Sequence, residues 1–242
     1  MNATARLIIA GALLALAAPA FSASPQAHSD CDAADPDRNI AGCTRIIDDL
    51  SEGAHMRSIA LVGRALAYEA KGDVDRAIAD FDAAIRLDAD DAEAHRQRAR
   101  LFLEKHDLDR AAADLDATIR LDPGRAFDHY VRGVIRYDRY TYASPWIEQS
   151  DLDGAIADLS EAIRLAPRDT RPYRARALAW RTDGRRDRFI ADMVEAARLN
   201  PSDTTLVASV EQLAPSAHIV AGDPVSDEYP LELGAKFHWD RH

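Results

Sequence analysis

The chain has 242 residues, of which 41 are acidic and 30 basic, so its formal net charge is −11. This excess of negative charge disfavours non-specific binding to nucleic acid. The chain has only two cysteines, without histidines nearby at ligand spacing, which makes a zinc site a poor interpretation. We therefore expect no nucleic-acid partner and no metal.

Residues 1–23 have the layout of a secretory signal peptide. A lone Arg6 precedes an apolar stretch from Leu7 to Ala18, and small residues follow it. This stretch is shorter than the roughly 20 residues that span a bilayer, and no second one follows. We expect a mature chain that is exported across the inner membrane and is not inserted in it.

The next segment, residues 24–57, contains both cysteines, Cys31 and Cys43. Because thiols pair in an oxidising compartment, export favours a disulfide between them. Closing a loop of this span contributes roughly 3 kcal/mol in the chain-entropy account. The alternative is two buried free thiols.

One pattern then occurs four times, in units 58–91, 92–125, 126–169 and 170–203. An arginine of the pattern recurs at intervals of 34, 34 and 44 residues, at Arg64, Arg98, Arg132 and Arg176. A period in the thirties with two helical patterns per unit indicates a helix pair that is stacked several times. The predicted fold is an all-α superhelix, in which residues 35–47 align with 73–85 and form an N-terminal half repeat.

The second helix of each unit shows an apolar stripe and a clear start. In the first unit the stripe contains Ile78, Phe81, Ile85 and Leu87, at spacings that place them on one side of a helix. The predicted N-caps are Asp73, Asp107 and Asp151, and closing prolines stand at 123, 167 and 201.

Every unit also carries an arginine in its first helix and an aspartate in its second. The pairs are Arg64/Asp80, Arg98/Asp114, Arg132/Asp158 and Arg176/Asp192. A charge pair that recurs in every unit indicates a ladder that fixes helix register, because ion pairs often specify geometry more than stability.

With small residues at 65, 99, 133 and 177 in the first helices and at 77, 111 and 155 in the second, the chain resembles a tetratricopeptide-repeat (TPR) protein over residues 58–203. It is similar to exported TPR proteins of Gram-negative bacteria, which implies a periplasmic location. The resemblance implies a scaffold for protein or peptide binding. No phosphate loop, nucleophile elbow or HExxH pair is present, so we expect neither an enzyme nor a cofactor.

In TPR proteins one face of each first helix lines a concave groove. Carrying those positions over predicts a peptide-binding set of Arg96, Arg100, Tyr130, Tyr137, Arg171, Arg174 and Arg181. Arg96 and Arg100 are four residues apart, so both guanidinium groups share a face and are expected to hold a carboxylate or another anion. An acidic or C-terminal peptide is the expected ligand, and ordinary solvated arginines are the alternative.

The third unit is ten residues longer than its neighbours, and the excess lies within residues 139–150. Pro145 argues against a simple helical extension there. The segment gathers Tyr140, Tyr142 and Trp146, residue types that are enriched in binding sites. We add them to the predicted binding set, and the alternative is that the rings fold back over neighbouring helices.

After the repeats, residues 204–213 predict a capping helix with Ser202 or Asp203 as its N-cap. Residues 214–242 leave the helical pattern and predict an extended acidic tail. The leading hypothesis is a non-catalytic scaffold of the cell envelope that binds a peptide in its groove. The alternative is a self-associating module, a homo-oligomer, in which the tail occupies the groove.

Overall fold

The computed structural model describes residues 24–142 and 149–215. In these two ranges the chain is all-α, with eleven helices and no strand. The signal-peptide pattern, Trp146 and most of the predicted tail lie outside them. No helix of the described ranges is both long and apolar enough to cross a membrane.

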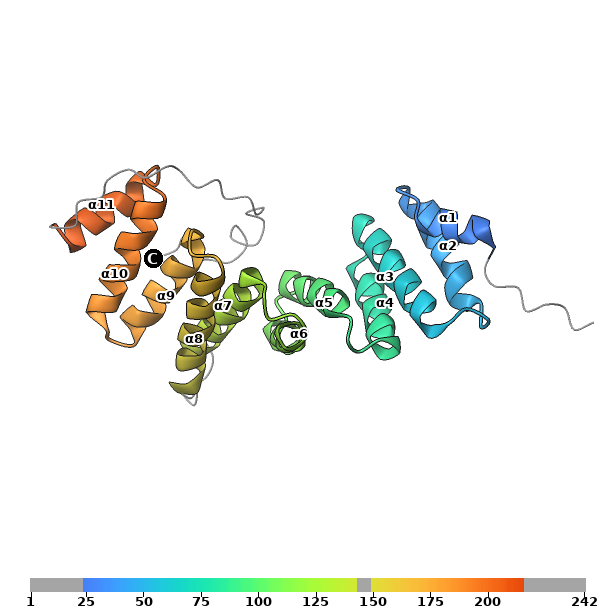
Figure 1. Ribbon diagram of the computed structural model, residues 1–242, viewed down its shortest axis with the longest axis horizontal. Helices are drawn as coiled ribbons and strands as arrows, with labels where there is room; N and C mark the ends of the chain where they lie inside the picture. Colours follow the sequence, from blue (N-terminus) through green and yellow to red (C-terminus); the bar gives the residue numbers. More distant parts are fainter. Residues whose placement is uncertain (1–23, 143–148, 216–242) are drawn as a thin grey trace, which may run out of the picture. The chain divides into compact units, whose positions relative to one another are not determined.

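The chain divides into two compact units, one ending at Ala89 and the other beginning at Asp90 (Figure 1). The helices of the first are α1 (Pro25–Cys31), α2 (Pro36–Asp48), α3 (Ala54–Ala70) and α4 (Val74–Leu87). Those of the second are α5 (Ala92–Glu104), α6 (Leu108–Leu121), α7 (Ala126–Tyr142), α8 (Gln149–Leu165), α9 (Thr170–Thr182), α10 (Arg186–Leu199) and α11 (Thr204–Leu213). Within each unit every helix packs against the next.

The apolar stripe of the second helices forms the core, as predicted. Phe81, Leu115 and Leu159 occupy the same position in successive repeats, and at most 3% of each is exposed. Small residues beside them, such as Ala65 and Ala177, are fully buried and let the two helices of a pair approach closely. The last position of the stripe is different, since Leu87 is 38% exposed at the end of α4.

The arginine–aspartate pairs are present in every repeat. Arg64 donates from Nε to Asp80 at 2.8 Å, and Arg132 and Arg176 donate to Asp158 and Asp192 at 2.9 Å each. A further guanidinium nitrogen reaches the second helix of the preceding repeat. Its acceptors are Thr44 for Arg64 (2.9 Å), Asp116 for Arg132 (2.7 Å) and Ser160 for Arg176 (2.9 Å). Each of these three arginines therefore joins two consecutive second helices, which is the register role predicted for the ladder.

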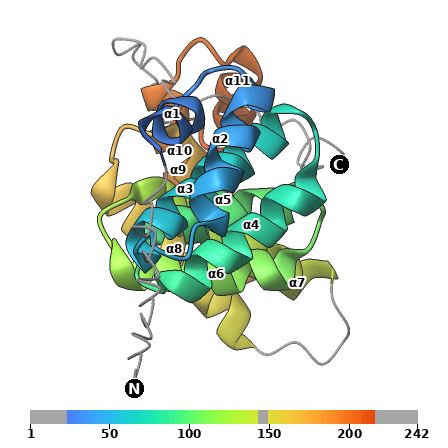
Figure 2. The ribbon, with the colours of Figure 1, turned by 90° about the vertical axis from the view of Figure 1, so that its right-hand side faces the viewer.

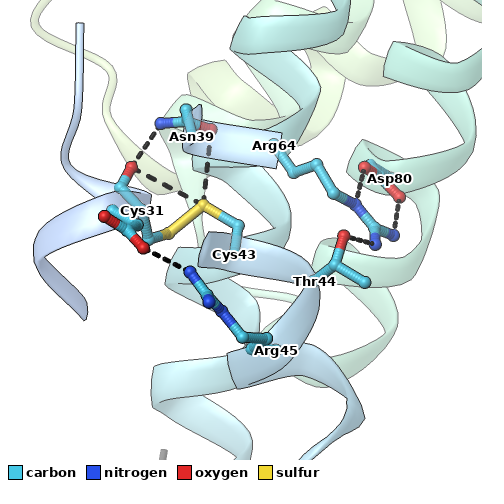
Figure 3. The surroundings of a disulfide bond; sticks show 8 residues. Cys31, Asn39, Cys43, Thr44, Arg45, Arg64 and Asp80 are labelled. Carbon is cyan, nitrogen blue, oxygen red and sulfur yellow. Dashed lines mark hydrogen bonds and ion pairs between the residues drawn. A yellow bond between two sulfur atoms is a disulfide. The ribbon is translucent and has the colours of Figure 1, made fainter. Parts of the chain in front are cut away.

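The N-terminal unit ends in a helix pair that a disulfide closes. α2 is the helix of the predicted half repeat, and the short α1 lies alongside it (Figure 1 and Figure 2). Cys31 at the end of α1 is bonded to Cys43 in α2, with Cα atoms 4.5 Å apart (Figure 3). The two helices approach closely at Gly42, where an added Cβ would lie 2.5 Å from the Asp30 carbonyl carbon.

Two of the predicted N-caps are correct and one is wrong. Asp73 and Asp107 accept hydrogen bonds from backbone N–H groups three residues on, at 3.2 and 3.1 Å. Asp151 does not begin α8, which starts at Gln149. The reason is that the ten extra residues partly lengthen the helices, because α7 continues to Tyr142. Pro145 itself lies outside the described residues, so its predicted effect on the insertion stays a prediction.

Candidate peptide-binding face

The predicted binding residues lie in the C-terminal unit, mostly on the first helices of its repeats. Arg96, Tyr130 and Arg174 hold the same position in α5, α7 and α9, and we call the surface around them the first-helix face. A recess of about 180 Å³ opens on it between α5 and α7. Its apolar lining comes from Leu103, Leu115, Phe127 and Val131, and Arg96 and Arg100 add the charge. We call it the α5–α7 recess.

Carboxylates of the protein itself already form ion pairs with Arg96. It donates from Nε to Asp128 at 3.0 Å and from a terminal nitrogen to Asp122 at 3.2 Å, and it also pairs with Glu93. Asp128 is 1% exposed, and burial raises the pKa of its carboxyl although the charge of Arg96 opposes this shift. Arg96 thus forms part of the recess wall together with these carboxylates. That Arg96 and Arg100 hold an anion together stays a prediction.

Asp128 is a residue of the candidate site that the sequence analysis missed. The corresponding positions of the other repeats hold Ala60, Ala94 and Pro172, all buried. An acidic residue in a column of small or apolar buried residues requires a cation nearby, because an unpaired buried charge is costly. Arg96 lies one repeat earlier, two residues after the corresponding Ala94, so the sequence already contained a cation for this column.

Beside the recess, aromatic rings and a guanidinium form a ledge between α7 and α9. The Phe127 and Tyr130 ring centroids are 6.1 Å apart, and the Arg171 guanidinium lies 5.7 and 5.6 Å from them. Asp169 holds Arg171 in place through hydrogen bonds of 2.9 and 2.6 Å. Burial raises the pKa of the Tyr130 phenol, which stays protonated at neutral pH. We call these three residues the aromatic ledge.

The two other predicted arginines of α9, Arg174 and Arg181, are not part of the aromatic ledge as defined. Arg174 is 54% exposed in its side chain, and its only described ion pair is a long one of 3.5 Å to Asp203, the N-cap of α11. Arg181 is exposed at the end of α9, with its guanidinium 6.0 Å from the Phe189 ring of α10. Arg100, on α5, donates to Gln97 Oε1 at 3.2 and 3.1 Å.

The aromatic residues of the long repeat divide between core and surface. Tyr137 is 8% exposed and its hydroxyl lies 3.1 Å from Thr182 Oγ1. Tyr140 packs against the buried cluster that contains Tyr137 and Leu152. Tyr142 is 78% exposed, whereas Trp146 lies outside the described residues. Of the described aromatic residues of the insertion, Tyr140 thus folds back onto the helices, whereas Tyr142 presents its ring to solvent.

Tyr142 lines a second, larger recess of about 710 Å³. The α5–α6 turn forms one side of this recess, and the lengthened ends of α7 and α8 form the other. Asp138 also lines it, and burial raises the pKa of its carboxyl to about 6. No group of three or more histidine, cysteine or acidic side chains in the described ranges is placed to hold a metal ion.

His95 and His129, for which the sequence analysis favours packing, are buried at 8% and 6% exposure. His95 Nδ1 lies 3.0 Å from Asp114, and His129 Nε2 lies 3.1 Å from the carbonyl oxygen of Pro123. These contacts place both rings in the scaffold and not on the first-helix face.

The repeating pairs of antiparallel helices define the class of protein, an all-α helical-repeat scaffold. A family model described as tetratricopeptide repeat matches residues 62–126. Together with the solved structures below, this match supports the resemblance to TPR proteins, and the predicted all-α superhelix is confirmed. Proteins of this fold are generally protein-binding scaffolds without catalytic activity.

Three solved structures illustrate the likeness. MamA is 20% identical, with 71% of this chain and 92% of that chain covered and a TM-score of 0.57. YrrB, described as a TPR protein with an unusual peptide-binding site, is 12% identical, with 76% and 87% covered and a TM-score of 0.61. MamA from Desulfovibrio magneticus RS-1 is 16% identical, with 78% and 92% covered and a TM-score of 0.52. These identities show the fold alone. No curated protein sequence matches the chain.

Proposed function

We propose that the chain is an exported, non-catalytic scaffold that binds a peptide or protein segment on the first-helix face of its C-terminal unit. The α5–α7 recess is the observation that carries this proposal. Its apolar lining is open on the same face as the aromatic ledge and the exposed Arg174. An apolar side chain that enters the recess would gain about 1.5–3 kcal/mol from burial.

The surrounding charges support a particular kind of ligand. Carboxylates of the protein already match Arg96 and Arg171, whereas Arg174 is more than half exposed and makes only a long ion pair. The favoured ligand therefore pairs an apolar residue, for the recess, with an acidic residue that can reach Arg174. The unusual peptide-binding site described for YrrB is consistent with this use of the fold.

An array of random twelve-residue peptides, probed with the mature protein, tests the proposal. Phe127→Ala removes the ring that the recess and the ledge share. It should raise the dissociation constant of the bound peptides at least about tenfold, equivalent to 1.4 kcal/mol. Ile59→Ala is the matched control, because Ile59 holds the same position in α3 and is 51% exposed. Arg174→Glu should shift the selected peptides away from acidic residues. If neither Phe127→Ala nor Arg174→Glu changes binding, the proposed site is wrong.

We propose export to the periplasm on two grounds, namely the signal-peptide pattern of residues 1–23 and the disulfide between Cys31 and Cys43. Residues 1–30 fused to an alkaline phosphatase that lacks its own leader should give enzyme activity in a Gram-negative host, because that enzyme is active only after export. A variant with Leu13→Arg and Leu14→Arg interrupts the apolar stretch and should be inactive. Equal activity of the two fusions would refute the proposal.

A further inference from the structure

The turn between α9 and α10 is unusually basic for this chain. Over residues 181–188 it carries Arg181, Arg185, Arg186 and Arg188, and we call these four the arginine turn. Its net charge is +2, whereas the corresponding windows of the first two repeats, 69–76 and 103–110, each have a net charge of −1. All four arginines are exposed.

The change arises largely at one position. Asp73 and Asp107 cap α4 and α6, and they also pair with Arg76 and Arg110 at 2.5 and 2.6 Å. At the corresponding N-cap of α10 stands Arg185, which makes no side-chain capping bond. Arg188, the counterpart of Arg76 and Arg110, therefore lacks the aspartate that neutralises them.

The Trp180 ring holds two of these guanidinium groups in place. Arg185 and Arg188 lie 5.2 and 4.6 Å from the Trp180 ring. Within the described ranges, Arg185 is the one member of the arginine turn in a salt bridge, to Asp183 at 2.5 Å. Stacking on a ring fixes a guanidinium without consuming its charge. The arginine turn is thus an ordered cationic surface, unlike Arg96, which its own carboxylates match.

We propose that the acidic segment 223–232 of the chain's own C-terminal tail docks on the arginine turn. This segment contains Asp223, Asp227, Glu228 and Glu232 and no lysine or arginine, so its charge complements the turn. Such pairs act over short range, since the Debye length is about 8 Å at physiological ionic strength. The overall charge of −11 therefore does not oppose docking at a locally basic turn.

The length of the chain allows the contact. α11 packs on α10, and the described part of the chain ends at Pro215, just beyond α11. The twelve residues from there to Asp227 can extend about 40 Å, whereas the 14-residue α10 is about 21 Å long. Because the tail is tethered, its effective concentration at the turn is in the millimolar range, so pairs that are individually weak are sufficient.

This docking site differs from the groove that the sequence analysis assigned to the tail. In the groove, Arg96 and Arg171 already have carboxylate partners, Asp128 of α7 and the N-cap Asp169 of α9. An acidic segment gains more at the arginine turn, and docking there leaves the α5–α7 recess open. The inference is therefore independent of the proposed peptide binding.

Carbodiimide cross-linking of the mature full-length chain tests the inference, because this reagent joins a lysine amine to a carboxylate only in close contact. A variant with Arg186→Lys and Arg188→Lys keeps the charge and supplies the amines. Mass spectrometry should detect links from these positions to Asp227, Glu228 or Glu232. The yield of these cross-links should fall at least about fivefold in 1 M NaCl, where the Debye length is about 3 Å.

The matched control carries Arg100→Lys and Arg174→Lys, which place the same two amines on the first-helix face, and circular dichroism verifies that both variants fold. Tail links from the control and not from the turn variant would overturn the inference in favour of the groove. The absence of tail links from both variants would overturn it as well. In a mixture of ¹⁴N- and ¹⁵N-labelled chains, mixed-isotope links would show that a second copy supplies the tail, which contradicts the inference.

Discussion

Removing the guanidinium of Arg176 should destabilise the C-terminal unit by about 3 kcal/mol. Arg176 donates to the two carboxylate oxygens of Asp192 at 2.9 and 2.8 Å and to Ser160 Oγ at 2.9 Å. The Asp192 side chain is 8% exposed, so Arg176→Met leaves a nearly buried carboxylate without its partner. Loss of one member of a buried pair costs about 3–5 kcal/mol. We expect the lower end, because Arg176 itself is 19% exposed and water can reach the site.

A double-mutant cycle separates the pair from its surroundings. Arg176→Met combined with Asp192→Leu removes both charges and should lie within about 1 kcal/mol of the natural protein, because an apolar pair can replace a buried ion pair at little cost. The coupling energy should then be at least about 2 kcal/mol. Urea unfolding followed by circular dichroism measures these differences, and hydrogen exchange localises them, since repeat arrays need not unfold in one step.

Additive losses would refute the reasoning. If the double variant is as unstable as the sum of Arg176→Met and Asp192→Leu, the two side chains contribute independently and the ladder does not act as a pair. A loss below about 0.5 kcal/mol for Arg176→Met would show that water already solvates the Asp192 carboxylate.

Three further predictions concern single positions. Gly42→Ala should lower the free energy of unfolding by about 1–3 kcal/mol, because its Cβ would overlap the Asp30 backbone, and it should speed hydrogen exchange in α1. The control is Gly53→Ala, where nothing lies within 4 Å of the added Cβ and stability should change by less than about 0.5 kcal/mol. Burial raises the pKa of the Asp138 carboxyl to about 6, above its unfolded value, so its stabilising contribution is present below about pH 4 and is lost as the pH rises through 6. Asp138→Asn should remove this loss and gain about 1–2 kcal/mol at pH 7 in urea unfolding, a value reduced for partial solvent exposure; an unchanged pH profile would contradict the assignment. Arg185→Asp should stabilise α10 by about 1 kcal/mol, because Arg185 has φ −87° and ψ 72°, close to the −91° and 71° of the N-cap Asp73; thermal unfolding measures the gain, and a lower midpoint would refute it.

The regular part of this fold was predictable because neighbouring repeats impose the same contacts on the same positions. The 34-residue period located the helix pairs, and the recurrence of Arg176 and Asp192 in every unit identified the ladder before its geometry was known. The short α1 was not predicted. Its seven residues are too few for a helical period, and it is stabilised by Cys31 and by the close approach at Gly42.

The candidate site was less predictable, because its residues depend on contacts between repeats. Arg96 reads as a solvated or ligand-binding arginine within its own helix, and its role depends on Asp128, which is 32 positions away. Tyr140 and Tyr142 are two residues apart in one segment, yet one packs on the core and the other is exposed, since successive positions point to different sides of α7. Composition identified these aromatic residues but could not tell which of them is buried and which is exposed.

Some residues that depart from the repeat pattern are compensated by a second change that they contact, and others are not. In the third repeat Arg136 replaces the aromatic residue of the other first helices, and Gly154 replaces the arginine that would stack on it. The two changes match, because an added Cβ at Gly154 would lie 3.1 Å from the Arg136 guanidinium, which pairs with Asp158 at 2.9 Å.

Asp128 is balanced in the same way by Arg96. A balanced departure preserves the scaffold and needs no ligand to account for it. The exchange of an N-cap aspartate for Arg185 is different, because it removes a capping bond and leaves Arg188 without a carboxylate among the described residues. Stability alone favours aspartate at that position. A basic turn that costs the scaffold stability, with an acidic segment of matching charge tethered within reach, is therefore better explained by binding than by packing.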